Sequence, residues 1–327
     1  MTQVQRRTLG KSDLHVSPLG LGCWQFSEGQ GLVGRFWPAL GPAVIDEIVN
    51  TSLQGGINWF DTAEIYGRGA SERALSSTLS RMGVKPSEVV IATKWWPVLR
   101  RASSIQKTID DRIRALSPYA IDLYQVHQPY SWSSIAQQME AMAAVVESHQ
   151  VRYVGVSNFS ARQMELAYTA LERRGITLVS NQVKYNLLHR KIESNDTLRL
   201  AKELGVSIIA YSPLEQGLLT GKFHGDPELL KRVSGPRKYS SGFSRRGLER
   251  TRPLIQSMQS IAEKHGATPA QVALNWLMHH HGDTVVAIPG ASRSAQASQN
   301  AGALSFVMSS EDSALLSELS WQVLGRS

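Results

Sequence analysis

One short stretch, Gly56-Ile57-Asn58-Trp59-Phe60-Asp61, is an apolar run that ends in a carboxylate, and Tyr66 follows it in the next loop. The same pattern returns in Val89-Val90-Ile91-Ala92-Thr93-Lys94 and in Ile121-Asp122-Leu123-Tyr124-Gln125-Val126-His127. Apolar runs of this length are typical of buried strands. Ionisable residues at the C-terminal ends of successive buried strands indicate the active face of an α/β barrel. The candidate catalytic residues are Asp61, Tyr66, Lys94 and His127.

Working outward, strand-like runs alternate with helical patterns along nearly the whole chain. We expect strands over residues 18–24, 56–61, 88–94, 121–127, 151–156, 178–182, 206–211 and 284–288. We expect helices over residues 44–55, 71–83, 103–116, 133–148, 160–174, 194–204, 252–265, 269–280 and 293–303. Sequential strand–helix units with right-handed crossovers build a parallel sheet. Eight units predict a single (β/α)8 TIM barrel domain that covers residues 1–327.

Two further segments complete this prediction. Residues 5–17 read as an N-terminal β-hairpin that covers the bottom of the barrel. Residues 213–250 read as a long irregular loop after the seventh strand, and connections of this length usually form lids or binding loops.

The main alternative fold is an open, doubly wound sheet. Its glycine fingerprint is incomplete here, because Gly20-Leu21-Gly22-Cys23-Trp24-Gln25 lacks the third glycine.

The composition limits the class of protein. The chain has 327 residues, 42% of them hydrophobic, and a net charge of +8, which suits anionic ligands such as phosphorylated cofactors. The arginines are dispersed in pairs rather than gathered into a reading motif, so we expect no nucleic-acid partner. The single cysteine, Cys23, permits no internal disulfide and reads as a small buried hydrophobe. No signal peptide and no apolar stretch of about 18 residues is present, so we expect a cytoplasmic protein with no membrane partner.

The most metal-like string is His279-His280-His281. Consecutive residues on a helix point about 100° apart, whereas helical metal ligands usually stand at i and i+4. We therefore expect no metal site, and we interpret the string as the solvated C-terminal end of a helix.

The four candidate catalytic residues together suit proton transfer to an oxygen. A tyrosine has a pKa near 10, and an ammonium group within about 4–6 Å lowers it. An aspartate would hold that ammonium group in place, and a histidine would hydrogen-bond an incoming carbonyl oxygen. A redox cofactor would have to supply the hydride. The alternative is structural, because a buried Lys–Asp pair or a strand-end histidine also occurs without catalysis.

The chain resembles the aldo-keto reductase family over nearly its full length. The resemblance rests on Ile57–Gly67, on the segments that contain Lys94 and His127, on Val154–Phe159 and on Tyr211–Lys222, and it is strongest to bacterial members near the potassium-channel β-subunits. It implies that Tyr66 is the general acid, that Lys94 lowers the pKa of Tyr66, that Asp61 supports Lys94 and that His127 orients the substrate carbonyl.

The resemblance also implies a nicotinamide cofactor. Tyr211 would stack on the nicotinamide, and its carboxamide would be held by Ser157, Asn158 and Gln182. The pyrophosphate contacts would be Ser212, Leu214, Gln216, Gly217 and Lys222. The adenosine end would be held by Gly290, Ser292, Arg293, Gln296 and Asn300. Many family members have Lys-Ser in place of Gly290-Ala291 and arginine in place of Gln296, so we expect Arg293 and Ser292 to bind the 2′-phosphate of NADPH.

The function we expect is NADPH-dependent reduction of an aldehyde or ketone. Trp24 and Trp95, which follow strand ends, are the candidate substrate contacts. The first alternative is an NADPH-loaded regulatory module like the channel β-subunits, and a weaker one is a barrel with cofactor-independent lyase or hydrolase chemistry. Sugars, aromatic aldehydes, short α-ketoaldehydes and pyridoxal all remain open as substrates, and the oligomeric state cannot be read from these residues.

Overall fold

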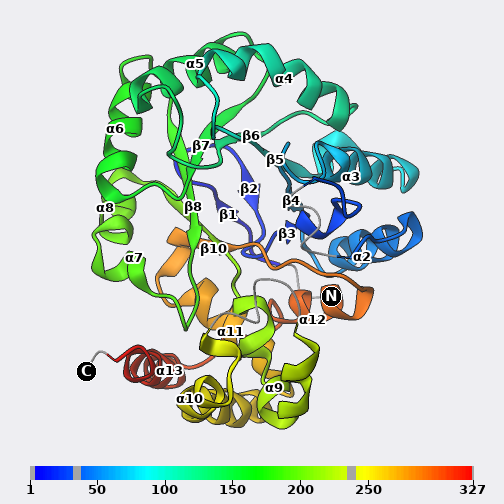
Figure 1. Cartoon of the computed structure of the whole chain (residues 1–327), viewed down its shortest axis with the longest axis vertical. Helices are drawn as coiled ribbons and strands as arrows, with labels where there is room; N and C mark the ends of the chain where they lie inside the picture. Colours follow the sequence, from blue (N-terminus) through cyan, green and yellow to red (C-terminus); the bar gives the residue numbers. More distant parts are fainter. Residues whose placement is uncertain (1–3, 32–37, 234–240, 326–327) are drawn as a thin grey trace.

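Eight parallel strands form the centre of the molecule (Figure 1). The computed structural model describes residues 4–31, 38–233 and 241–325. The strands are β3 (Leu21–Gly22), β4 (Trp59–Asp61), β5 (Val90–Trp95), β6 (Leu123–Val126), β7 (Tyr153–Ser157), β8 (Leu178–Lys184), β9 (Ser207–Tyr211) and β10 (Val285–Ala287). They pair in sequence order from β3 to β10.

The sheet closes into a barrel where its first and last strands meet. Leu19 and Gly22 form parallel bridges with Ala287 and Gly290. The amide of Gly20 donates a hydrogen bond of 2.8 Å to the carbonyl of Ala287. The (β/α)8 fold expected from the sequence is confirmed.

Helices cover the outside of the barrel (Figure 1). They are α2 (Pro42–Gln54), α3 (Ala70–Arg81), α4 (Ser103–Leu116), α5 (Ile135–Glu147), α6 (Ala161–Glu172), α7 (Lys191–Ser194), α8 (Thr197–Leu204), α9 (Lys222–Gly225), α10 (Arg245–Lys264), α11 (Pro269–His279), α12 (Ser294–Gly302) and α13 (Ser310–Val323). Local sequence explains their starts. Ser134 and Ser160 each form a capping box with a glutamine three residues on, which satisfies free amides at the first turn. Among the described residues, no helix is long and apolar enough to cross a membrane.

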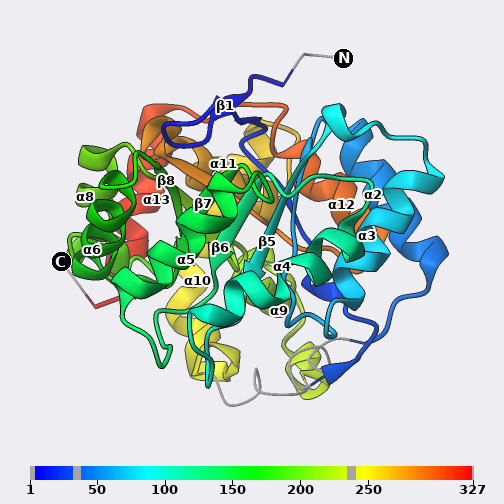
Figure 2. The same cartoon turned by 90° about the horizontal axis from the view of Figure 1, so that it is seen from above.

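The expected N-terminal hairpin is confirmed. Strand β1 (Arg7–Thr8) pairs antiparallel with β2 (His15–Val16). Its turn buries Leu9 and Leu14 against Trp59 inside the barrel. Figure 2 shows the hairpin at one end of the barrel and α9 at the other. Side chains of the hairpin therefore fill this end of the barrel.

The segment after β9 differs from its prediction as one long loop. It contains the short helices η3 (Glu215–Thr220), α9, η4 (Pro227–Arg232) and η6 (Ser241–Phe243), while residues 234–240 lie outside the described part. Helix α10 begins at Arg245 rather than at 252, because Ser244 caps it and Pro253 lies inside the helix. Helices α7 and α13 were not predicted.

Candidate active site

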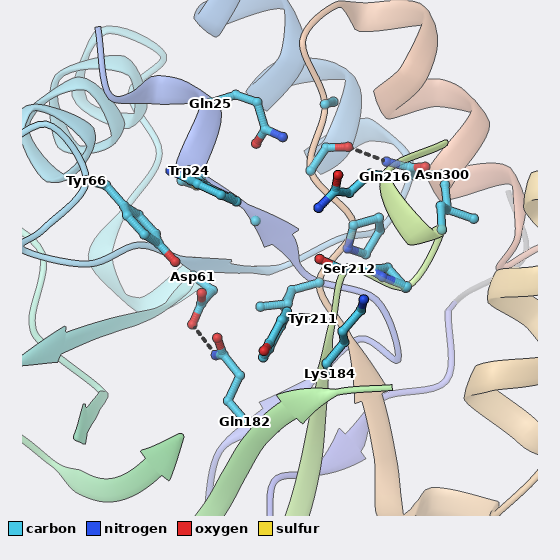
Figure 3. Close-up of a pocket in the computed structure, with 18 of the residues that line it drawn as sticks. Trp24, Gln25, Asp61, Tyr66, Gln182, Lys184, Tyr211, Ser212, Gln216 and Asn300 are labelled. Atoms are coloured by element: carbon cyan, nitrogen blue, oxygen red, sulfur yellow. Dashed lines mark hydrogen bonds between the residues drawn. The ribbon is translucent and has the colours of Figure 1, made fainter. Parts of the chain in front are cut away.

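A cavity of about 540 Å³ opens at the C-terminal ends of the strands. Most of the predicted site residues line it: Trp24, Asp61, Tyr66, His127, Ser157, Asn158, Gln182, Tyr211, Ser212, Leu214, Gln216, Gly217, Lys222, Gly290, Ser292, Gln296 and Asn300. Lys94 lies beneath this surface and reaches it through Asp61, whereas Trp95 and Arg293 do not line the cavity. Figure 3 shows the side chains that converge from several strands.

Asp61 is the centre of a buried polar network. Lys94 is fully buried, and its Nζ donates to Asp61 Oδ1 and, at 2.8 Å, to the carbonyl of Thr62. Asp61 Oδ2 accepts hydrogen bonds from Gln125 Nε2 at 3.1 Å and Gln182 Nε2 at 2.8 Å (Figure 3). A buried carboxylate requires such partners, because its charge is otherwise costly to desolvate. The network fixes Asp61 and Lys94 in one arrangement.

Tyr66 lies above this pair. Its ring stacks on Trp24 with centroids 6.0 Å apart and meets the edge of His127 at 5.7 Å. Lys94 Nζ is 5.1 Å from the centre of the Tyr66 ring. The structure thus brings together all four residues that the strand ends predicted.

The electrostatics of Tyr66 differ from the sequence expectation. Burial, and then the negative charge of Asp61, raise the pKa of Tyr66 well above its usual range. Burial is the larger cause, because the phenolate form would lose its hydration inside the protein, and the carboxylate of Asp61 adds to the shift. Tyr66 therefore remains protonated at neutral pH, as a proton donor must.

His127 stays neutral. Burial and then the charge of Lys94 lower its pKa well below the usual range. Its ring packs edge-on against Trp96 with centroids 5.2 Å apart, and Nδ1 has no hydrogen-bond partner among the described residues. A neutral imidazole at this place can hydrogen-bond a carbonyl oxygen without protonating it.

The expectation for Trp95 requires a correction. Trp95 is fully buried outside the cavity, where its Nε1 donates to Ser104 Oγ at 3.0 Å. Trp96 lines the cavity instead. Side chains alternate between the two faces of a strand, so with Lys94 pointing inward, Trp95 must point outward. That alternation was readable from the sequence.

The residues predicted for the nicotinamide lie together on one side of the cavity. Tyr211 Oη donates to Asn158 Oδ1 at 3.0 Å. Ser157 Oγ donates to the carbonyl of Gln182 at 2.9 Å. A phenol ring, a hydroxyl and two amides at adjacent strand ends can hold a planar ring and its carboxamide.

The residues predicted for the pyrophosphate form an unusual turn after β9. Ser212, Glu215, Gln216 and Gly217 all have positive φ values, of 51°, 45°, 54° and 98°. Three of them are not glycine, so the turn is strained and needs support. Such turns direct backbone amides toward one point and can bind anions.

The support comes from a pair of residues that were not predicted. Lys184 forms an ion pair of 2.6 Å with Glu215. Asn186 donates to the carbonyl of Ser212 at 2.9 Å and to Glu215 Oε2 at 2.8 Å. Lys184 stands two residues after Gln182 in the same strand, and this spacing was a usable signal that it faces the cavity.

The residues that line the cavity where the sequence predicts adenosine are uncharged. The amide of Ser292 donates to Gln296 Oε1 at 2.8 Å, and Asn300 Nδ2 donates to the carbonyl of Gly290 at 3.3 Å. Arg293 is exposed at the start of α12. That Arg293 binds a 2′-phosphate therefore stays a prediction.

The family to which this chain belongs follows from a comparison of its sequence with models of known protein families. The model of the Aldo/keto reductase family matches residues 18–320. The chain belongs to the aldo/keto reductase family. It is consequently an NAD(P)H-dependent oxidoreductase that acts on small carbonyl compounds. The alternative of a regulatory module is not favoured.

Several known proteins are similar to this aldo/keto reductase. An uncharacterized oxidoreductase of Mycobacterium tuberculosis (strain CDC 1551 / Oshkosh) is 38% identical over 296 residues, which cover 90% of this chain and 87% of the relative. The chloroplastic pyridoxal reductase of Arabidopsis thaliana is 32% identical over 313 residues, covering 91% and 82%. The structure of glycerol dehydrogenase from Gluconobacter oxydans is 25% identical with a TM-score of 0.83, covering 100% of this chain and 98% of that one.

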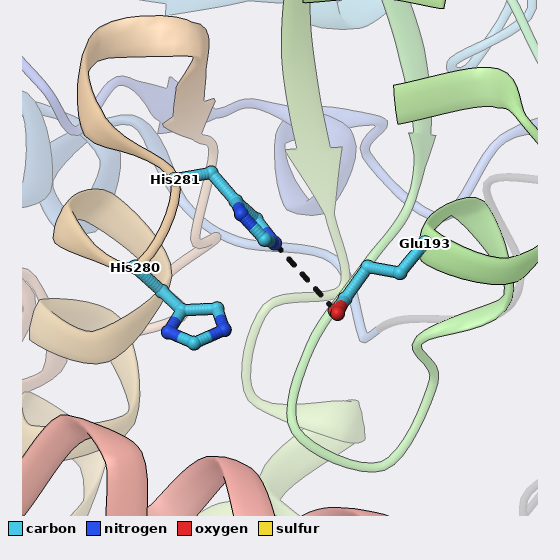
Figure 4. A group of neighbouring side chains, drawn as sticks. All are labelled: Glu193, His280 and His281. Atoms are coloured by element: carbon cyan, nitrogen blue, oxygen red, sulfur yellow. Dashed lines mark ion pairs between the residues drawn. The ribbon is translucent and has the colours of Figure 1, made fainter. Parts of the chain in front are cut away.

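The histidine string lies in a second cluster, away from the cavity. Glu193, His280 and His281 offer ligand atoms within 4.8 Å of one another (Figure 4). The expectation that consecutive histidines diverge on a helix is wrong here, because α11 ends at His279 and His281 lies beyond it. The three histidines are half-buried rather than fully solvated, and His280 stacks on Trp276 with centroids 4.4 Å apart.

This cluster is better suited to an ion pair than to a metal. Arg190 Nε and Nη2 each donate to the carboxylate of Glu193 at 2.7 Å. Tyr185 Oη donates to the same carboxylate at 2.8 Å. A metal ion would therefore have to displace a guanidinium and stand beside its charge. We assign the cluster to the attachment of α7 to the end of α11.

Proposed function

We propose that this protein reduces an aldehyde or ketone to the alcohol with NADPH, and that Tyr66 donates the proton. The observation that carries the proposal is the phenol of Tyr66, kept protonated by burial, beside a neutral His127 and above the Asp61–Lys94 pair. The proton donor and the orienting group line the cavity, and a lysine lies beneath its surface. This set fits protonation of a developing alkoxide.

The residues would act in sequence on a carbonyl substrate. When bound, NADPH supplies the hydride that is added to the carbonyl carbon. His127 holds the carbonyl oxygen toward Tyr66. Tyr66 then releases its hydroxyl proton to that oxygen, and the transient phenolate lies near Lys94, whose Nζ is 5.1 Å from the ring centre. Asp61 holds Lys94 in place throughout.

The strained turn after β9 fits the diphosphate of such a cofactor. Gln216 and Gly217 have positive φ values, and the Lys184–Glu215 ion pair holds the turn without any ligand. Lys222 lines the same part of the cavity. The net charge of +8 further favours a polyanionic ligand.

The preference for NADPH rests on Arg293 and Ser292 at the start of α12. A helix N-terminus and a nearby guanidinium both favour a phosphate. Arg293→Ala should weaken NADPH binding at least about tenfold and leave NADH binding unchanged within about twofold. The measurement is fluorescence titration without substrate. Equal losses for both dinucleotides would remove Arg293 from this role.

The catalytic proposal is tested with Tyr66→Phe. Turnover in steady-state NADPH oxidation with a panel of aldehydes should fall by about 100-fold or more. Cofactor binding should not change, because only the hydroxyl is lost. Tyr130→Phe is the matched control, since Tyr130 is 69% exposed outside the cavity and should retain full turnover. A fully active Tyr66→Phe enzyme would refute the proposal.

A further inference from the structure

We propose that Gln25 is a cofactor-binding residue, and that position 290 is a glycine so that the carboxamide of Gln25 can occupy the space of a side chain there. This inference rests on the proposed function, because it assumes that the cavity binds a nicotinamide dinucleotide. It adds a residue to the cavity wall that the strand-end pattern did not predict.

The first observation is the close approach of the two positions. Gln25 lies in η1 (Trp24–Phe26), directly after β3, and Gly290 follows β10. These segments meet where the barrel closes, since Gly22 and Gly290 form a bridge. A Cβ atom at Gly290 would lie 2.4 Å from Gln25 Oε1 and 2.6 Å from Gln25 Nε2. Gln25 therefore fills the volume into which any side chain at 290 would start.

Backbone conformation does not explain this glycine. Gly217, in the turn after β9, has a φ of 98°, which disfavours other residues. Gly290 is not among the residues with a positive φ. The atoms nearest to a Cβ at 290 all belong to the carboxamide of Gln25, so a side chain at 290 would have to move that carboxamide.

The second observation concerns the hydrogen bonds of Gln25. Its Oε1 is buried and has no hydrogen-bond partner among the described residues. Gln25 and Gly290 both line the cavity, and Figure 3 shows the carboxamide directed into it. A buried amide oxygen without a hydrogen-bond partner is unfavourable unless a ligand satisfies it. A glutamine offers both a donor and an acceptor, so the conclusion does not depend on how the amide is turned.

The chemistry of the ligand follows from a neutral amide at this place. Ribose hydroxyls both donate and accept, and phosphate oxygens accept, so a carboxamide can bind the ribose–diphosphate part of the dinucleotide. Many family members carry lysine at position 290, which would meet the cofactor as a cation. In this chain the uncharged carboxamide of Gln25, which follows β3, takes the place of that lysine side chain beside the end of β10. The contact is to a part that NADPH and NADH share.

A double-mutant cycle tests the inference. Gln25→Ala, Gly290→Ala and the double variant are titrated with NADPH and, separately, with NADH, using protein fluorescence without substrate. Gln25→Ala should weaken both dinucleotides by about 3–10-fold. Gly290→Ala should cause a similar loss, because its methyl group displaces the carboxamide. The double variant should bind no more weakly than either single variant, because both changes remove the same contact.

The control is Gln30→Ala, which alters an exposed glutamine of the same loop and should bind normally. Circular dichroism of the free variants checks folding. If Gly290→Ala does not fold, Gln25→Asn replaces it, since a shorter arm should lose the contact. Binding of Gln25→Ala within twofold of the wild type, or losses that multiply in the double variant, would overturn the inference alone. Failure of the wild type to bind either dinucleotide would overturn the proposed function as well.

Discussion

Two buried clusters of carboxylates and cations lie on opposite faces of β5, and only one of them belongs to the cavity. On the inner face, Lys94 pairs with Asp61 below Tyr66. On the outer face, Thr93 Oγ1 donates to Glu72 Oε1 at 2.6 Å, and Arg112 approaches Glu72 Oε2 at 3.2 Å. Consecutive residues of one strand therefore serve different clusters, because a strand alternates its faces.

The outer cluster holds helices and loops in place. Glu64 Oε1 accepts hydrogen bonds of 2.5 Å from the amide of Trp96 and from Arg100 Nη1. It thereby fixes the loop that carries Trp96 to the cavity. Burial of an ion pair therefore does not by itself identify a catalytic site. The inner cluster is distinguished by its contact with a tyrosine and a histidine that face a ligand-sized cavity.

The largest expected effect comes from removing the inner cation. Lys94→Met should lower turnover by about 100-fold or more, because the phenolate of Tyr66 loses its nearby positive charge. It should also lower the melting temperature, since Asp61 is left buried without its cation. Steady-state NADPH oxidation and thermal denaturation measure the two effects. If Lys94→Met retained more than a tenth of wild-type turnover, the inner cluster would not differ from the outer cluster in its role in catalysis.

The two adjacent tryptophans sharpen the same distinction. Trp95→Ala should cost about 3–5 kcal/mol of the free energy of unfolding, because it opens a hole in the core behind β5. Trp96→Ala should be much less destabilising but should raise the KM for carbonyl substrates several-fold, since it lines the cavity. Denaturant titration and substrate kinetics are compared side by side. If Trp95→Ala raised the KM and Trp96→Ala lowered the free energy of unfolding by the larger amount, the assignment of Trp95 to the core and Trp96 to the cavity would be wrong.

The outer cluster should be visible in the pH dependence of stability. Burial raises the pKa of Glu72 to about 7, although Arg112 and Thr93 oppose this. Between its usual pKa and 7, the native protein binds more protons than the unfolded chain, so stability falls as the pH rises. Glu72→Gln has no carboxyl group to titrate at this position and therefore does not lose stability in this way. The free energy of unfolding of Glu72→Gln minus that of the wild type should therefore rise between pH 4.5 and pH 8, by at most about 3 kcal/mol.

Denaturant titrations of wild type and Glu72→Gln at several pH values test this, with the exposed Glu88→Gln as the control. Turnover of Glu72→Gln should remain within a few-fold of wild type, because Glu72 does not line the cavity. A stability difference that stays constant with pH would contradict the assignment.

The smallest expected effect concerns the turn after β9. Lys184→Met should weaken dinucleotide binding a few-fold, because the strained residues 212–217 lose the ion pair that holds them. Hydrogen exchange of these amides in the free protein should become faster. The exchanged pair Lys184→Glu with Glu215→Lys should recover part of the loss. If hydrogen exchange of these amides is unchanged in Lys184→Met, the ion pair does not stabilise the turn.

Much of the fold and of the inner cluster was predictable from local pattern. The strand–helix alternation is a property of neighbouring residues, and it placed Asp61, Lys94 and His127 at strand ends. Parallel strands of a barrel bring those ends to one rim, so residues far apart in sequence were expected to meet. The N-terminal hairpin was likewise readable from a polar turn between two short β-type runs.

What the amino-acid order determined by itself was thus the barrel, its active end and the identity of the central residues, because periodicity and turn chemistry act over a few residues. Only the tertiary structure decided that Gln182 donates to Asp61, that Lys184 holds Glu215, and that Gln25 occupies the space beside Gly290. These relations join residues that are distant in sequence, and a local pattern carries no information on the distance, packing or burial between them.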